Sequence, residues 1–442
     1  MALHFEQAAR HLSALSPIDA SPIMRGRMVS GGGLRIAAKG LHAPIGQMVR
    51  IIAPDGAVRL AEIAGYEADI AQLIPFEDMA GVAPGAVIEI VGAAGQIAIG
   101  PEYLGRVIDA MGEPLDGKGA IAATSHAPLR SAAGNVLDRA PVTQPLDTGV
   151  RAINALLPAG RGQRVALIAG SGVGKSSLMR QILSGTDAEI VVLGLIGERA
   201  REVSELVEHV TRSGALCRMV VVAVSADRAP LLRIKAVERA CAIAEYFRGQ
   251  GKSVLLFIDS LTRVAHAQRE IGLAMGEPPT MKGYPPSAIA LIPQIVERAG
   301  NDRVSGGSIT AFYTILADGD DLDDPIVDAT RAITDGHIIL DRHLADQGVY
   351  PAIDAGRSIS RVADALVDRD QAVAMRHFRK LWSSYSEKRD LVLMGAYQAG
   401  SDPVLDEALA RRADQLAFLT QDMAENIDLD ASRDTLVTEF GQ

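Results

Sequence analysis

One short stretch constrains this chain more than any other, because it has the glycine spacing of a loop that wraps around phosphate groups. It consists of Ala169, Gly170, Ser171, Gly172, Val173, Gly174, Lys175, Ser176 and Ser177. The apolar run Val165–Ile168 precedes it and Leu178-Met179 follows it, and this order predicts a strand, a turn and a helix. Since glycines let backbone N–H groups converge on an anion without Cβ clashes, we expect the chain to bind a nucleoside triphosphate.

Two side chains of this stretch have expected roles. Lys175 is expected to reach the terminal phosphates, and the hydroxyl of Ser176 to hold a magnesium ion. The first position is Ala169, where the strict phosphate-loop pattern has glycine. The alternative is a glycine turn that only caps a helix, but the strand before it and the helix after it favour phosphate binding.

Composition sets the broad class of the protein. The chain has 442 residues, 48% of them hydrophobic, which allows a large core. Its net charge of −10 argues against a general electrostatic attraction to nucleic acid. Cys217 and Cys241 are too few for a disulfide framework, and the scattered histidines form no zinc motif. Because we find neither a bilayer-spanning apolar run nor a signal-peptide order in Met1–Pro17, we expect a soluble protein of the cell interior.

The residues before the phosphate loop predict a helix and then a barrel. Residues 3–16 have apolar side chains at helical spacing, which predicts a short amphipathic helix that docks on its own domain or on a partner. Short apolar runs separated by turn signals follow, and they predict a small β-barrel. These runs are Gly46–Ile52, Val58–Ala64 and Ala86–Val91.

Strand and helix patterns alternate from the phosphate loop onward. The strand runs are Arg164–Ile168, Glu189–Ile196, Met219–Val224, Ser253–Ile258 and Ser308–Ile315, and the helical runs begin at about Arg201 and cover Leu231–Phe247 and Leu261–Gln268. This alternation predicts a mostly parallel sheet with helices on both faces. Residues 364–425 predict helices only, broken at Gly395, Gly400 and Pro403.

We therefore expect an α/β fold in four parts. They are an amphipathic segment (1–23), a β-barrel domain (24–95), a phosphate-loop domain with a parallel sheet (96–360) and a helical C-terminal domain (361–442).

Two carboxylates follow predicted strands. Asp259 follows Ser253–Ile258, and because ligands bind beyond the carboxyl ends of parallel strands, we expect it to orient the magnesium ion near Ser176. The alternative is that Asp259 caps the next helix. Glu198 follows Glu189–Ile196 and is the candidate that polarises the attacking water, the alternative being a first-turn acid that complements a helix dipole. An arginine from a neighbouring molecule is also expected, but composition does not choose among the arginines.

Many ordered motifs resemble the type III secretion ATPase family, which is related to the catalytic subunits of rotary ATP synthases. The matching stretches are Leu104–Asp109, Gly112–Asp116, Thr148–Ile153, Gly160–Gln163, the phosphate loop, Gly197–Arg199, Arg201–Val203, Asp259–Arg263, Gly276–Pro279, Lys282–Ser287, Glu297–Gly300, Asp335–His337, Leu340–Arg342, Tyr350–Asp354 and Ser358–Arg361. The segment Gly276–Ser287 resembles the export ATPases rather than the synthase subunits. The segment Gly395–Asp402 resembles the flagellar branch more closely than the injectisome branch.

The resemblance implies a RecA-like P-loop ATPase core that binds ATP and Mg²⁺ and assembles as a homohexamer. It implies that Lys175 and Ser176 bind phosphate and metal, that Glu198 activates water and that Asp259 supports the metal.

The resemblance assigns three further residues. Arg199 would contact the phosphate region, and Tyr350 would stack on adenine. Arg361 would be an arginine finger that acts in trans at the neighbouring subunit's site. From the residues alone, a buried strand-end tyrosine and a lone surface arginine remain alternatives for Tyr350 and Arg361.

The function implied by the resemblance is Mg²⁺-dependent ATP hydrolysis that energises or primes protein export through the flagellar type III apparatus. Implied partners are regulator and stalk proteins, export substrates and chaperones, and the membrane export gate, at which a cytoplasmic protein would be peripheral to the inner membrane. No nucleic-acid partner is expected. The alternatives are an injectisome ATPase and a rotary synthase-type subunit. A non-enzymatic subunit is disfavoured by Glu198, and a nucleic-acid translocase by the acidic balance.

Overall fold

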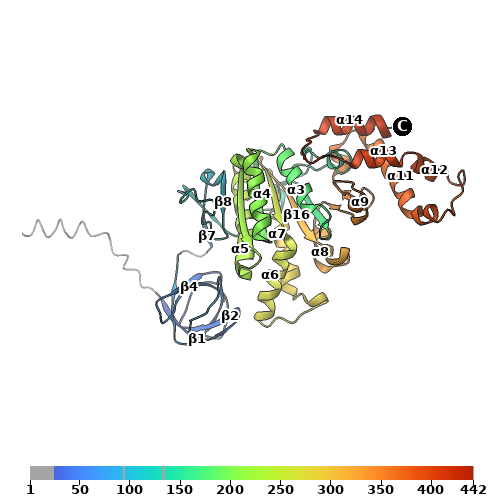
Figure 1. Cartoon of the computed structure of the whole chain (residues 1–442). Coiled ribbons are helices and arrows are strands. Elements are labelled where there is room, and N and C mark those ends of the chain that lie inside the picture. Colours follow the sequence, from blue (N-terminus) through green and yellow to red (C-terminus); the bar gives the residue numbers. More distant parts are fainter. Residues whose placement is uncertain (1–23, 93–94, 132–134, 442) are drawn as a thin grey trace, which may run out of the picture. The chain divides into compact units, whose positions relative to one another are not determined.

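The computed structural model describes residues 24–92, 95–131 and 135–441 (Figure 1). The amphipathic helix predicted over residues 3–16 lies outside these residues. The chain forms two compact units that divide between Ala94 and Gly95. We call them the barrel unit and the sheet unit.

The barrel unit is a closed antiparallel barrel with the strand order β1-β2-β5-β4-β3-β6. Its strands are β1 (Arg25–Gly32), β2 (Arg35–Lys39), β3 (Met48–Ile52), β4 (Val58–Glu67), β5 (Ile70–Pro75) and β6 (Val87–Ile90). In β1, β2 and β3, alternate residues are buried in the barrel core, such as Val49 and Ile51 of β3. The predicted barrel is confirmed, and the three predicted strand runs correspond to β3, β4 and β6.

The sheet unit contains a ten-stranded sheet whose main order is β18-β17-β11-β16-β14-β12-β13-β8. The strands of this main order are β8 (Arg106–Ile108), β11 (Arg164–Ala169), β12 (Ile190–Glu198), β13 (Met219–Ser225), β14 (Ser253–Asp259), β16 (Ser308–Leu316), β17 (Gly336–Ile339) and β18 (Ile359–Ser360), and β10 (Arg139–Ala140) and β15 (Gly300–Asp302) are attached at one side. From β17 to β8 the pairing is parallel, whereas β18, β15 and β10 pair antiparallel. A separate ribbon pairs β7 (Gln96–Ile99) with β9 (Ser125–Pro128).

Helices cover both faces of this sheet, as the alternating pattern predicts. In β11, Val165 and Leu167 join one buried cluster, and Ala166 and Ile168 join the other. The first cluster includes residues of α2 (Arg151–Leu156), α3 (Lys175–Gly185), α4 (Ala200–Arg212) and α9 (Arg342–Asp346). The second includes residues of α5 (Pro230–Gly249), α6 (Leu261–Ala274), α7 (Pro286–Val296) and α8 (Pro325–Ile333).

The last part of the chain is helical and gathers at one end of the sheet unit, coloured orange to red in Figure 1. It consists of α10 (Ala363–Leu366), α11 (Arg369–Leu393), α12 (Pro403–Ala410), α13 (Arg412–Leu419) and α14 (Leu429–Phe440). Phe378 of α11 packs its ring against Trp382, Phe418 and Phe440. These aromatic residues belong to the same buried cluster as α3, so the helical segment and the phosphate-loop helix share one core.

The sequence pattern misses several elements for identifiable reasons. Helix α7 was not predicted because Pro286 and Pro293 resemble helix breakers; Pro286 occupies the first turn, and Pro293 lies inside the helix. Strand β17 is only four residues long. Helix α14 lies inside the predicted helical domain (361–442) but beyond the helical run 364–425 that the sequence pattern indicates. It begins at a local signal, the Asp428 side chain, which accepts a hydrogen bond from the N–H of Ala431 at 2.8 Å. Of the described helices, none is both long and apolar enough to cross a membrane.

Candidate nucleotide-binding site

The site lies at the carboxyl edge of the parallel sheet. The phosphate loop follows β11, while Glu198 and Asp259 are the last residues of β12 and β14. Strand β16 lies between β11 and β14, and β14 lies between β16 and β12. Because parallel strands end at a common edge, residues far apart in the sequence meet there.

The placement of both carboxylates rules out their alternative roles. Glu198 belongs to β12, and the acid in the first turn of α4 is Glu202 instead. Asp259 belongs to β14, and the residue that caps α6 is Ser260, whose side chain accepts from the N–H of Arg263. Neither carboxylate therefore serves as a helix cap or first-turn acid.

The phosphate loop has the backbone that its glycines predict. Gly174 has φ = 97°, a left-handed conformation that other residues rarely adopt. A Cβ at Gly170 would lie 1.9 Å from Oδ1 of Asp320, so a side chain there would displace that carboxylate. Helix α3 begins at Lys175, so its first N–H groups have no hydrogen-bond partner within the helix. They point out of the helix N-terminus, toward the phosphate loop. A helix start after a glycine loop is a general anion-binding arrangement.

Lys175 is the centre of the site. Its Nζ is paired with Oδ1 of Asp259 and lies 3.5 Å from Oε1 of Glu198. All three side chains are close to fully buried. The structure thus brings together the lysine and both carboxylates that the sequence singled out.

The local charges shift the pKa values of this group. Burial raises the pKa of Glu198 above its ordinary value of 4.5, and the negative charge of Asp259 adds to the rise, whereas Lys175 opposes it. Burial by itself would lower the pKa of Lys175, but the charges of Asp259 and Glu198 outweigh it and raise that pKa. Lys175 is therefore charged, and Glu198 is a stronger proton acceptor than an exposed glutamate.

Thr314 of β16 is a site residue that sequence reasoning missed. Its buried hydroxyl donates a hydrogen bond of 2.5 Å to Oδ1 of Asp259, the same oxygen that Lys175 contacts. A threonine inside an apolar strand looks like an ordinary β-former, so its pattern gave no signal.

Arg263 is a second missed residue. It lies in the first turn of α6 and packs against the backbone next to Glu198, since a Cβ at Gly197 would lie 2.9 Å from Cβ of Arg263. Its positive charge contributes a lowering effect to the pKa of Glu198. The sequence did contain an indication of this role. A positive charge in the first turn of a helix is unfavourable with the helix dipole, so an arginine at that position suggests an interaction with another group.

Tyr350 and Arg199 have different surroundings. The ring of Tyr350 lies against the phosphate loop, because a Cβ at Gly174 would be 3.2 Å from two of its ring carbons. Tyr350 is 40% exposed and thus not a buried strand-end tyrosine. Arg199 precedes α4, has a side chain that is 85% exposed and pairs with Glu202 at 3.6 Å, so it does not join the Lys175 cluster.

The residues at this edge fit a magnesium ion in chemical terms. Mg²⁺ takes oxygen ligands and is usually bound by one or two protein groups together with substrate phosphates. Ser176 offers a hydroxyl in the first turn of α3, and Asp259 offers a buried carboxylate. The two carboxylates of Glu198 and Asp259 face one ammonium group, that of Lys175. A further cation such as Mg²⁺ would therefore be attracted to this cluster. Within the described part of the chain, no group of three or more His, Cys, Asp or Glu is arranged to hold a metal by itself.

Arg361 lies at the opposite, amino edge of the sheet. It follows β18, in which Ser360 pairs with Gly336, and Gly336 in turn pairs with Val165 near the start of β11. The exposed side chain donates a hydrogen bond of 3.1 Å to the carbonyl oxygen of Arg331. The fold therefore separates Arg361 from Lys175 of the same chain by the length of β11.

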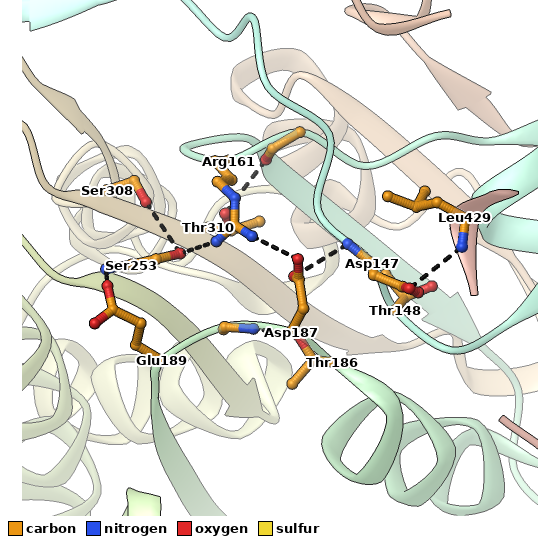
Figure 2. Close-up of polar contacts among 12 residues, drawn as sticks. Asp147, Thr148, Arg161, Thr186, Asp187, Glu189, Ser253, Ser308, Thr310 and Leu429 are labelled. Atoms are coloured by element: carbon orange, nitrogen blue, oxygen red, sulfur yellow. Dashed lines mark hydrogen bonds and ion pairs between the residues drawn. The ribbon is translucent and has the colours of Figure 1, made fainter. Parts of the chain in front are cut away.

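A groove of about 710 Å³ lies along the same amino edge, at the starts of β12, β14 and β16. Figure 2 shows its polar network, in which Arg161 binds the hydroxyl of Ser253 and pairs with Asp187 at 2.5 Å. Asp187 also accepts a hydrogen bond from the N–H of Asp147 at 3.2 Å. These contacts hold the connecting loops of this edge together.

Comparisons with known proteins agree with this geometry. Residues 149–360 match the profile of the ATP synthase alpha/beta family nucleotide-binding domain, and residues 367–438 match that of the T3SS EscN ATPase C-terminal domain. The chain is 47% identical to the flagellum-specific ATP synthase of Pseudomonas aeruginosa, over 95% of this chain and 94% of that one. It is 46% identical to the Salmonella typhimurium protein of the same name, over 97% of each.

A solved structure shares the fold over most of this chain. The assembled ATPase EscN of the enteropathogenic E. coli type III secretion system aligns with a TM-score of 0.88 and 40% identity, covering 93% of this chain and 99% of EscN. The chain belongs to the family of flagellar and type III secretion ATPases. It is an ATPase with a phosphate-loop nucleotide site, and the family resemblance of its motifs is confirmed.

The Thr314 contact gives a first prediction. Thr314→Val keeps the side-chain shape but removes a buried donor from Asp259, so we expect kcat/KM for ATP to fall roughly tenfold. Thr314→Ser keeps the hydroxyl and should stay close to wild type. Steady-state phosphate release, with thermal unfolding as a control for folding, measures the difference. Equal activity of the Val and Ser variants would show that this hydrogen bond does not matter for turnover.

Proposed function

We propose that this chain hydrolyses Mg²⁺-ATP as a homohexameric ring and that hydrolysis energises or primes protein export through the flagellar type III apparatus. One observation carries the enzymatic part: Lys175 of the phosphate loop is buried between Glu198 and Asp259 at the carboxyl edge of the sheet. The flagellar part rests on relatives that are named flagellum-specific ATP synthases. They match this chain over nearly their whole length.

The residues of the chain have distinct tasks in this proposal. The N–H groups of the phosphate loop and the ammonium group of Lys175 bind the terminal phosphates. Glu198 accepts a hydrogen bond from the attacking water and aligns it behind the terminal phosphate. Its raised pKa suits this task, because a more basic carboxylate polarises water more strongly.

Ser176 and Asp259 would hold the magnesium ion, Ser176 through its hydroxyl and Asp259 through its carboxylate. A bound Mg²⁺ neutralises charge on the phosphate oxygens. Thr314 keeps the Asp259 carboxylate in one orientation for that purpose.

Arg361 acts in trans in this proposal. The phosphate loop lies at the carboxyl edge and Arg361 at the amino edge, so the amino edge of one copy must face the carboxyl edge of the next for the two to meet. Such a head-to-tail contact closes into a ring when its rotation divides a full turn. An arginine supplied in this way typically contributes about 10³–10⁵ in rate.

Tyr350 provides the adenine platform in this proposal. Its partly exposed ring lies beside the phosphate loop, where an aromatic face can stack on a base. Arg199 would approach the phosphate region only when the start of α4 moves, because in this structure its exposed side chain pairs with Glu202.

The helical tip of the sheet unit is the proposed contact for a stalk protein. Three apolar side chains at the end of α11 are strongly exposed, namely Leu391, Leu393 and Met394. A solved structure shows the assembled ATPase EscN in complex with its central stalk EscO, and EscN shares this fold with a TM-score of 0.84. Regulator proteins, export substrates, chaperones and a membrane export gate are further proposed partners, which would place a cytoplasmic protein peripherally at the inner membrane.

Two alternatives remain as second candidates. The chain is 43% identical to the type 3 secretion system ATPase of Xanthomonas euvesicatoria over 90% of its length, which favours an injectisome ATPase as runner-up. A rotary synthase-type subunit is supported by the nucleotide-binding domain profile alone. Loss of filaments from cells that lack the gene would favour the flagellar role over both.

Glu198→Gln tests the enzymatic proposal. The amide has the same shape but cannot accept a proton, so we expect turnover to fall by roughly 10²-fold or more while ATP binding persists. Phosphate release and binding of a fluorescent ATP analogue measure the two quantities. Wild-type turnover of this variant would refute the role of Glu198.

Leu393→Asp tests the stalk contact. We expect basal ATP turnover to stay unchanged and the affinity for the stalk protein to fall roughly tenfold, as the loss of one buried interface anchor does. Leu115→Asp is the control, because Leu393 and Leu115 are exposed leucines, 67% and 56%, and Leu115 lies away from the tip, near β8. Equal stalk binding by both variants would contradict a contact at this tip.

A further inference from the structure

The loop of residues 317–324, which connects β16 to α8 and is rich in aspartate, lies against the phosphate loop. We call it the acidic loop. Oδ1 of Asp320 is so close to Gly170 that a Cβ there would collide with it. The same carboxylate binds Arg342, with Nε at 2.8 Å from Oδ2 and Nη2 at 3.3 Å from Oδ1. Arg342 reaches on to the phosphate loop, where its Nη2 donates a hydrogen bond of 3.2 Å to the carbonyl oxygen of Ser171.

This last contact orients a backbone group of the phosphate loop. In a trans peptide, the carbonyl of one residue and the N–H of the next point in opposite directions. When Arg342 holds the Ser171 carbonyl on its side of the loop, the N–H of Gly172 must point to the other side. A fixed donor costs less to bring to an anion than one that must first be ordered.

The acidic loop is held from a second side by Lys282. Lys282 lies in the short helix η4 (Met281–Gly283), pairs with Asp321 and lies 3.8 Å from Asp324. Lys282 has φ = 49° and Asp320 has φ = 61°, and in the described residues only Ala68 is a further non-glycine residue with positive φ. Such backbone conformations persist where surrounding contacts hold them, and they cluster at functional sites.

This side of the phosphate loop borders a small cavity. The cavity has a volume of about 250 Å³. Its lining includes Gly170, Asp320, Arg342 and Arg357 together with apolar residues, among them Ile168, Leu322 and Ile339. Arg357 is occupied elsewhere, because it pairs with Asp341 and, at 2.5 Å, with Asp354. Of these two arginines, Arg342 is thus the one that bonds to the phosphate loop.

We propose that Arg342 is a positioning residue for the phosphate loop, which it holds through the Ser171 carbonyl while Asp320 orients it and Lys282 anchors the acidic loop. The proposal rests on the proposed function of the same site, since the loop is positioned for the phosphates of ATP. It gives a role to the Leu340–Arg342 motif, which the enzymatic proposal leaves unused.

Arg342→Ala tests the proposal. We expect the Kd for a fluorescent ATP analogue and the KM for ATP to rise roughly tenfold, as the loss of a charged hydrogen-bond donor does, with kcat within about twofold of wild type. Arg342→Lys can still donate to the carbonyl and should recover much of the affinity. Asp320→Asn should weaken binding in the same direction, because it removes the charge that orients Arg342.

Arg433→Ala is the matched control. Arg433 is likewise a partly exposed arginine in an ion pair, with Asp368, but it belongs to α14. We expect its nucleotide affinity to equal that of the wild type. If Arg342→Ala and Arg433→Ala bind the analogue equally well, the positioning role is wrong.

The Lys282 step has its own test in a double-mutant cycle. Lys282→Ala should raise KM by a smaller factor, and in the Arg342→Ala background it should have no further effect, because both act through the same loop. Independent, multiplying effects of the two substitutions on KM would overturn the link to Lys282.

A fall in kcat at unchanged KM for Arg342→Ala would also overturn the proposal. By contrast, failure of the wild type to release phosphate while it binds the analogue would overturn the proposed function and leave the binding test of Arg342 valid.

Discussion

The structure depends on one buried cluster of charges, in which Lys175 faces both Glu198 and Asp259. Removing one partner from a buried ion pair usually costs about 3–5 kcal/mol, because the remaining charge is left without compensation. The three side chains come from one helix start and two strand ends, so the cluster ties the phosphate loop to the sheet. In the proposed reaction Lys175 binds the phosphates instead of the two carboxylates. Glu198 then binds the attacking water, and Asp259 would bind the magnesium ion.

The fold makes this cluster possible because strands distant in sequence end side by side. The parallel strands send alternate residues to two separate cores, and one of these cores continues through α3 into the aromatic cluster around Phe378. The exposed apolar tip of α11 belongs to the same helix as Phe378. This shared core offers a physical connection between the proposed stalk contact and the phosphate loop.

The sequence predicts those parts of the site that local patterns define. Glycine spacing locates Lys175, and strand ends locate Glu198 and Asp259, because both follow from the geometry of a parallel sheet. It does not predict Thr314 or the bond from Arg342 to Ser171, since these contacts join residues from separate elements and depend on side-chain packing. The proposed role of Arg361 is outside the reach of any single-chain pattern, because it requires a second copy. Only the family resemblance pointed to it.

The central claim is that each site is shared by two copies of the chain, and a mixing experiment tests it most directly. Lys175→Ala and Arg361→Ala should each be inactive alone. When the two variants are mixed and reassembled in equal amounts, about a quarter of the sites should combine an intact lysine with an intact arginine, so ATP turnover should reappear. Mixed rings that assemble but stay as inactive as either variant alone, or an Arg361→Ala ring with wild-type turnover, would contradict the account.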